Sequence, residues 1–294
     1  MLHQGRLSLD FKPVSDVRAE LGESPVWSEA DACVWWVDIS GQRLLRTGAD
    51  GATETWEMPE QVGFVALATA GLVVGMESGL FAFDPASGVF ERLVALEAPG
   101  VRFNDATTDA AGRLWAGTMD LENRRPVGQL LRIDPDLTVT VVAEGMRTPN
   151  GLAVDSPGDE AGGRLFFSDS HPDVQTIWVA DLDIRGGRIA ERRIFARMHE
   201  AAGRPDGGAL DEDGNYWSAG VDGGAIHVFT PDGNHLFEFL TPMPDPTKIA
   251  FGGPDLRHIY LTSKAGSGAG GQLAVIETAF RGRETTPFGY RRPA

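Results

Sequence analysis

The sequence predicts an all-β protein, a six-bladed β-propeller with four antiparallel strands in each blade. The first observation is a repeat: short runs of β-branched and aromatic residues recur about 40 to 50 residues apart, which is the size of a propeller blade. The second is the content of 37 glycines and 18 prolines, which suits many tight turns between short strands. The third is that no sustained 3.6-residue apolar periodicity separates the runs, so few helices are expected.

Each repeating unit contains two such runs, which predicts a β-hairpin in every blade. The first runs begin at Val34, Leu72, Leu114, Leu165, Tyr216 and Ile259. The second runs cover residues 43–46, 79–84, 129–134, 176–180, 225–229 and 272–276. Turn signals such as Asp84-Pro85 follow several second runs, and each unit has room for two further strands. The alternative is a β-sandwich with an accidental repeat, and the near-even spacing of six units argues against it.

The two ends of the chain decide how the ring closes. The stretch Leu7–Val17 precedes the first full unit, and the last unit ends near Ile276. We expect the N-terminal strand to pair with the C-terminal blade, because this pairing removes an open sheet edge. The polar, arginine-bearing tail Phe280–Ala294 is expected to be poorly ordered. No linker divides the chain, so residues 1–294 are expected to form one domain.

The charge balance disfavours several classes of partner. Lys and Arg number 26 against 42 Asp and Glu, a net charge of −16, which argues against nucleic acid and against an anionic membrane surface. The chain has no apolar run of the length of a membrane span and no secretory-type leader. The single cysteine, Cys33, excludes an internal disulfide and a multi-cysteine zinc site. We therefore expect a soluble cytoplasmic protein, a monomer or small homo-oligomer, with a small-molecule partner.

One equivalent position precedes the first run of every unit and is polar in five of the six. In a propeller this position lies where the innermost strand begins, so its side chain points into the mouth of the central channel. The six residues are Glu23, Phe64, Asn104, Asn150, Asp206 and Lys248. Taken singly, their Pro and Gly neighbours are ordinary turn chemistry. In phase with the blade repeat, they indicate a shared site on the propeller axis.

The polar residues of this mouth predict a metal site. Two carboxylates and two carboxamides gathered in a small space would repel one another and lose solvation, and one divalent cation would offset both costs. Oxygen donors suit Ca²⁺, Mg²⁺ or Mn²⁺, and Zn²⁺ also accepts carboxylates. Lys248 is expected either to neutralise surplus carboxylate charge or to contact the substrate.

Five ordered motifs carry a close resemblance to a known family. They are the segments Leu21–Trp27, Arg102–Ala106, Gly112–Met119, Pro149–Ala153, and Arg204–Gly208 with Asp211–Trp217. The chain resembles the sugar-lactonase family that includes gluconolactonase and regucalcin, over nearly its whole length. That resemblance implies a six-bladed propeller with one divalent metal on its axis. It further implies that the metal ligands are Glu23, Asn150 and Asp206, and that the substrate-binding residues are Arg102, Asn104 and Glu122.

The chemistry implied is the opening of a sugar-acid lactone by water. The metal would polarise the lactone carbonyl and stabilise the developing oxyanion. Asp206 is the candidate catalytic residue, as general base for the attacking water, while Arg102 and Asn104 would orient the sugar ring. An assignment of Asp206 to ligation alone, with a metal-bound hydroxide as nucleophile, stays open.

Two other functions stay open as well. A propeller of this design also supports calcium-dependent phosphotriester hydrolysis, and a non-catalytic calcium-binding propeller is the third possibility. A serine mechanism of the α/β-hydrolase type has no support, since the sequence contains no Gly-x-Ser-x-Gly motif. Asp105 and Asp169 are expected either to support the site through hydrogen bonds or to cap turns.

Overall fold

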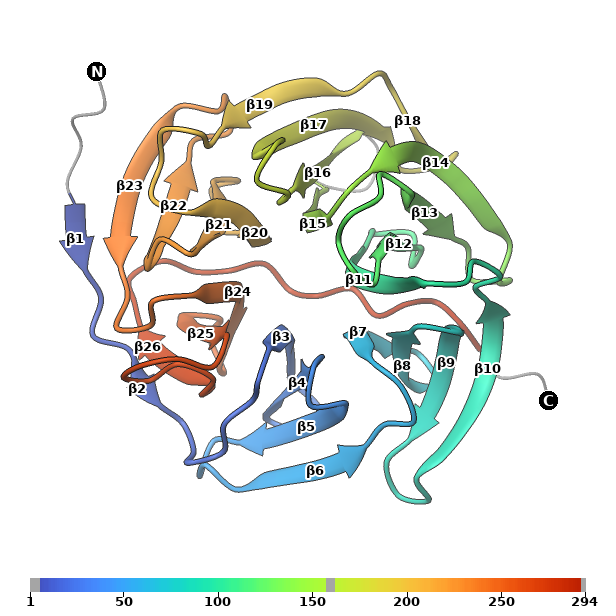
Figure 1. Ribbon diagram of the computed structural model, residues 1–294, viewed down its shortest axis with the longest axis horizontal. Helices are drawn as coiled ribbons and strands as arrows, with labels where there is room; N and C mark the ends of the chain where they lie inside the picture. The colour runs from blue at the N-terminus through green and yellow to red at the C-terminus, as the bar shows by residue number, and fades with distance from the viewer. Residues whose placement is uncertain (1–5, 157–161, 292–294) are drawn as a thin grey trace.

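The computed structural model describes residues 6–156 and 162–291, and in these ranges every regular element is a β-strand. Six separate sheets surround a central axis, as Figure 1 shows. The structure confirms the all-β, six-bladed fold that the repeat predicts. Within the same two ranges, no helix of the length and apolarity needed to cross a membrane was found.

Each blade is an antiparallel meander that runs from an inner strand beside the axis to an outer strand at the rim. The first three blades comprise β3 (Gly22–Ser28), β4 (Cys33–Asp38), β5 (Arg43–Gly48) and β6 (Thr53–Glu57); β7 (Val62–Ala68), β8 (Gly71–Met76), β9 (Gly79–Asp84) and β10 (Val89–Ala95); and β11 (Val101–Thr108), β12 (Leu114–Asp120), β13 (Gly128–Ile133) and β14 (Val139–Met146). The last three comprise β15 (Pro149–Asp155), β16 (Gly163–Asp169), β17 (Thr176–Asp183), β18 (Arg188–Ile189) and β19 (Arg193–Arg197); β20 (Arg204–Leu210), β21 (Tyr216–Val221), β22 (Ala225–Phe229) and β23 (His235–Leu240); and β24 (Pro246–Gly252), β25 (His258–Ser263) and β26 (Ala274–Glu277).

The N-terminal segment closes the ring, as predicted. Strand β2 (Lys12–Pro13) pairs antiparallel with β26 and becomes the fourth strand of the sixth blade. The structure adds a contact that the repeat did not predict, because β1 (Arg6–Ser8) pairs in parallel with β23 of the fifth blade. The N-terminal chain therefore covers the outer edges of two neighbouring blades (Figure 1).

A repeated hydrogen-bonded turn explains part of the sequence repeat. Asp109 and Asp211 are fully buried, and each accepts a hydrogen bond from the indole nitrogen of the tryptophan six residues later, at 3.0 Å in both blades. The same carboxylates accept backbone N–H groups of the intervening turn, including those of Arg113 and Asn215. Trp115 and Trp217 fill the blade cores. The motif thus connects the turn to apolar packing between blades, because Trp115 shares a core cluster with residues of the fourth blade and Trp217 packs on Phe251 of the sixth.

All six inner strands share an irregularity at the end where they begin. The pairing register shifts between Glu23 and Val26 in β3, and equivalent shifts occur in the other five inner strands. A bulge leaves one or two residues out of the ladder and re-aims their side chains. The residues that the sequence placed at the channel mouth lie in these bulges or directly beside them, so the bulges position the site.

The C-terminal tail differs from the prediction. Residues 278–291, here called the strap, cross the propeller at the end of the channel opposite the bulges (Figure 1). Phe288 and Tyr290 are buried against the second and third blades, and Phe280 packs on Trp217 with ring centroids 4.9 Å apart. The expectation of a poorly ordered tail was wrong for these residues, because three aromatic anchors outweigh the polar composition. Residues 292–294 lie outside the described ranges.

Candidate active site

The bulges gather four polar side chains of the predicted set at the mouth of the channel. Glu23 comes from β3, Asn104 from β11, Asn150 from β15 and Asp206 from β20, and all four are buried. The side-chain amide of Asn150 donates a hydrogen bond to Asp206, and that of Asn104 donates to the carbonyl oxygen of Pro149 at 2.9 Å. Three neighbouring blades are therefore joined through the site residues themselves.

Glycine beside these residues is required by close packing as well as by turn geometry. Gly151 has φ of +62°, and a Cβ there would lie 2.4 Å from the Tyr216 hydroxyl oxygen and 2.9 Å from the Asp206 carbonyl oxygen. The Tyr216 hydroxyl in turn donates to the Gly151 carbonyl at 2.7 Å. A side chain at Gly151 would push the backbone that carries Asn150 away from Asp206. No sequence pattern predicted the part played by Tyr216.

Arg102 lies buried beside Asn104 and presents an unused donor. Its Nη1 donates to the Asn104 side-chain oxygen at 2.6 Å and to the Phe103 carbonyl at 2.9 Å. In the described part of the chain, the buried Nε has no hydrogen-bond partner. Burial lowers the pKa of Arg102 to about 10, although the nearby carboxylate of Glu23 acts in the opposite direction. A buried, unpartnered N–H group suits recognition of an oxygen atom on a bound molecule.

The negative charges of the two site carboxylates, Glu23 and Asp206, are only partly balanced by nearby positive charges. Burial, reinforced by the negative charge of Asp105, raises the pKa of Glu23 to about 7, while Lys248 and Arg102 act in the opposite direction. Burial and the charge of Glu23 raise the pKa of Asp206 well above its ordinary value. Both shifts express the cost of placing two negative charges in a confined space with little water.

This donor set fits a hard divalent cation. It combines two buried carboxylates with carboxamide oxygens, which are the ligands that such cations prefer. Within the described residues, no group of three or more His, Cys, Asp or Glu side chains could hold a metal ion. A cation here would therefore depend on the amide oxygen of Asn150 as well as on Glu23 and Asp206.

Other residues singled out from the sequence lie differently. Glu122 is on the exposed loop between β12 and β13, with a side chain 67% exposed, and it pairs with Arg124 at 3.1 Å rather than with the buried cluster. Phe64 is fully buried and packs edge-on against Phe103, so the second blade contributes an apolar wall. Asp169 accepts the backbone N–H groups of Arg147 and Thr148, and thus shapes the turn that leads to Asn150.

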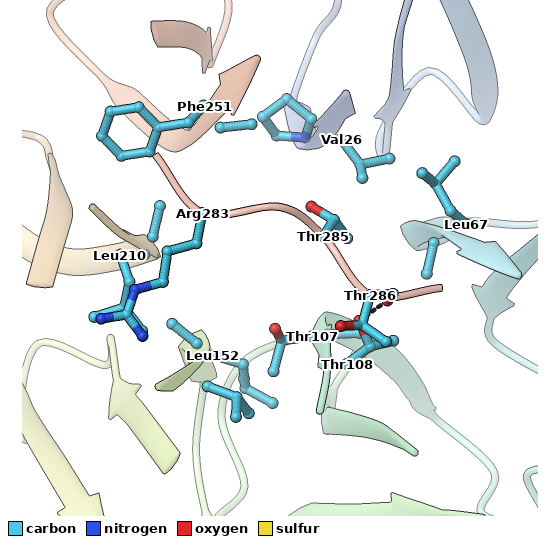
Figure 2. Close-up of a pocket in the computed structure, with 18 of the residues that line it drawn as sticks. Val26, Leu67, Thr107, Thr108, Leu152, Leu210, Phe251, Arg283, Thr285 and Thr286 are labelled. Atoms are coloured by element: carbon cyan, nitrogen blue, oxygen red, sulfur yellow. Dashed lines mark hydrogen bonds between the residues drawn. The ribbon is translucent and has the colours of Figure 1, made fainter. Parts of the chain in front are cut away.

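A cavity of about 310 Å³ lies inside the ring, between the bulges and the strap. The inner strands form its walls, and Figure 2 shows the strap crossing it with Arg283, Thr285 and Thr286. Its lining includes Lys248, whereas Glu23, Asn150 and Asp206 lie outside it. The polar site and the cavity are therefore two successive compartments of one channel.

Fold and geometry together define a six-bladed propeller with a buried, oxygen-rich site at one end of its channel. The profile of the SMP-30/Gluconolactonase/LRE-like region matches residues 21–265. The chain belongs to this family, and the strap lies beyond the matched region. The resemblance inferred from the five motifs is confirmed.

Individual relatives extend this finding. The chain is 40% identical to a 6-deoxy-6-sulfogluconolactonase of Pseudomonas putida over 86% of its own length and 87% of that protein. It is 33% identical to a pentonolactonase of Haloferax volcanii, over 87% and 86% of the two chains. In fold it is similar to a crystal structure from Agrobacterium tumefaciens described as a calcium-binding protein, regucalcin. That match has a TM-score of 0.90 at 24% identity and covers 97% of this chain and 99% of the other.

Proposed function

We propose that the protein is a lactonase that opens sugar-acid lactones to the free acids with the help of one divalent metal. The observation that carries the proposal is the convergence of Glu23, Asn150 and Asp206 in a buried site beside the unpartnered donor of Arg102. Two relatives that align with most of the chain are named lactonases, and both names specify sugar-derived lactones.

Glu23, Asn150 and Asp206 would hold the metal, which supplies a Lewis acid for the lactone carbonyl when bound. Oxygen donors allow calcium, magnesium, manganese or zinc at such a site, with calcium and magnesium the hardest of the four. Arg102 would donate from Nε to a sugar or carbonyl oxygen, and its bond to the Asn104 side-chain oxygen leaves it in a fixed orientation.

The proton transfers of hydrolysis are assigned to Asp206. Asp206 would accept the proton of the attacking water while the water oxygen bonds to the carbonyl carbon. The ring C–O bond then breaks, and the proton passes to the departing ring oxygen. The alternative is that Asp206 binds the metal without acting as the general base.

The direct test is a pH-stat titration of acid release from a panel of pentono- and hexono-lactones. It uses chelator-stripped protein to which each divalent metal is added back. We expect turnover that depends on added metal. Hydrolysis of a phosphotriester without lactone turnover would indicate the second hydrolase class instead, and metal binding without any turnover would indicate a non-catalytic propeller.

Glu122 is proposed to contact the sugar on the strength of the family resemblance alone. Its exposed loop follows the end of β12 that pairs with the beginning of β11, and its partner Arg124 shares that loop. The variant Glu122→Gln keeps the size of the side chain and removes its charge. If Glu122 binds substrate, KM rises while kcat is retained, and an unchanged KM in the titration assay would remove Glu122 from the site.

A further inference from the structure

A buried ion pair spans the channel directly beneath the proposed active site. Lys248 lies in the bulge of β24 in the sixth blade, and Asp105 lies in the bulge of β11 in the third blade. These two blades face each other across the axis (Figure 1). The ammonium group of Lys248 donates to Oδ1 of Asp105, and the two side chains are only 8% and 3% exposed.

The path of the Lys248 side chain is built into the neighbouring blade. A Cβ on Gly207 would lie 2.3 Å from the Cγ of Lys248 and 2.8 Å from its Cα. Gly207 directly follows Asp206, so the lysine passes against the backbone that carries one of the proposed ligands. Because the Lys248 Cα also lies too close, rotation of the lysine side chain alone would not accommodate a larger residue.

Asp105 links Lys248 to the segment that carries a second proposed ligand, Asn150. Its Oδ2 accepts the backbone N–H of Leu152 at 2.8 Å, and Leu152 lies two residues after Asn150 in the same bulge. Its Oδ1 also accepts the N–H of Ala106 at 2.8 Å, and the Lys248 ammonium lies 3.3 Å from the Ala106 carbonyl oxygen. Lys248 and Asp105 thus connect the sixth, third and fourth blades.

The pair also fixes the charge next to the site. Asp105 acts electrostatically on both Glu23 and Asp206, and Lys248 acts on Glu23 in the opposite sense. Without the lysine, Asp105 would be a third uncompensated carboxylate in the same buried space. With it, the bridge carries no net charge, and two carboxylates remain to balance one divalent ion.

Given the proposed lactonase function, we infer that Lys248 is a positioning residue for that reaction. It neutralises Asp105, keeps this carboxylate out of the metal's ligand set, and holds it against the Leu152 amide so that Asn150 keeps its orientation. Lys248 does not touch substrate in this role, and it separates the polar site from the cavity beneath it.

The variant Lys248→Met tests the inference, because it keeps an unbranched apolar chain and removes the charge. We expect kcat to fall by about 10–100-fold with little change in KM, as for other residues that orient metal ligands. We also expect the chelator-stripped variant to bind Ca²⁺ or Mn²⁺ alone about tenfold more tightly in calorimetry, because Asp105 is now free to attract the cation.

A second variant separates positioning from folding. Adding Asp105→Asn to Lys248→Met removes the unpaired charge, and it should return the metal affinity and part of kcat towards the wild-type values. Lys12→Met is the matched control, since the Lys12 side chain is exposed and forms its ion pair with Asp10, also exposed, at 2.6 Å. This variant should change nothing.

The outcomes are distinct for the two proposals. Unchanged metal affinity in Lys248→Met, with a loss of kcat no larger than the loss of folded protein in thermal unfolding, would overturn the positioning role. Absence of lactone turnover in the wild-type protein would overturn the proposed function, while the metal affinities of the variants would still decide whether Lys248 controls Asp105. Failure of the wild type to bind any divalent metal would overturn both.

Discussion

The two ends of the central channel are built on opposite principles. At the mouth, every inner strand has a bulge, and charged groups such as Glu23 and Asp206 are buried with incomplete compensation. At the far end, the inner strands have regained regular pairing, and the strap adds backbone hydrogen bonds and buried aromatic rings. The proposed site therefore lies where the fold is locally unfavourable, whereas the opposite end of the channel is regular.

The strap shows how the far end compensates. Its backbone bonds to the sixth blade through Gly282 and Leu256, to the fifth through Glu212 and Arg281, and to the second through Phe288 and Leu67. Arg283 adds an ion pair to Asp155 of the fourth blade. A single segment therefore ties together blades that are not neighbours in the ring, which limits any opening of the ring under repulsion at the mouth.

The largest effect is expected at the mouth, where activity and stability should respond in opposite directions. Asp206→Asn removes the proposed base and should lower kcat by about 10²–10⁴-fold. The same change removes a buried charge beside Glu23, so the metal-free protein should unfold at a higher temperature. Lactone titration and thermal unfolding of one preparation measure both. Asp173→Asn, on an exposed side chain, is the control, and equal losses of activity and stability would contradict the comparison.

The next largest effect is expected at the strap, with the signs reversed. Phe288→Ala empties a fully buried position and should lower the free energy of unfolding by about 3–5 kcal/mol, measured by urea titration. The kcat of the folded fraction should be retained, because Phe288 lies at the end of the channel opposite the site. Thr285→Ala, on an exposed strap residue, should be nearly neutral. A lower kcat for Phe288→Ala under conditions in which all of the protein is folded would show that the strap and the channel mouth are coupled.

The smallest effect concerns buried His227 and its partly buried partner His235. His227 bonds to the Ala202 carbonyl at 2.9 Å and to His235 at 3.2 Å, and burial lowers the pKa of both imidazoles, against an opposing effect of Glu238. The unfolded chain therefore binds these protons more readily than the folded chain does. Stability from this pair is present above pH ~6.5 and is lost as the pH falls below that value. Replacing His227 by Gln should flatten this part of the dependence of melting temperature on pH, whereas an unchanged slope would assign it to other groups.

Much of the molecule was determined by the sequence itself. The spacing of the strand runs reflects local preferences for strand and turn, and six near-equal units leave a propeller as the natural way to bury them. The same repeat placed Glu23, Asn150 and Asp206 at equivalent positions, and the structure brings them into one buried region. The inference of the fold succeeds because each strand and turn depends on residues close together along the chain.

Contacts across the ring were decided by the tertiary structure alone. Lys248 and Asp105 meet only because their blades face each other at the channel diameter, and no local pattern relates residues so far apart in the chain. The prediction of a poorly ordered C-terminal tail was wrong for the same reason. Phe280, Phe288 and Tyr290 follow no strand or helix period, and each packs against residues of other blades. Closure of the ring brings these residues into contact. Burial of the aromatic rings and the pairing of opposite charges then stabilise the contacts.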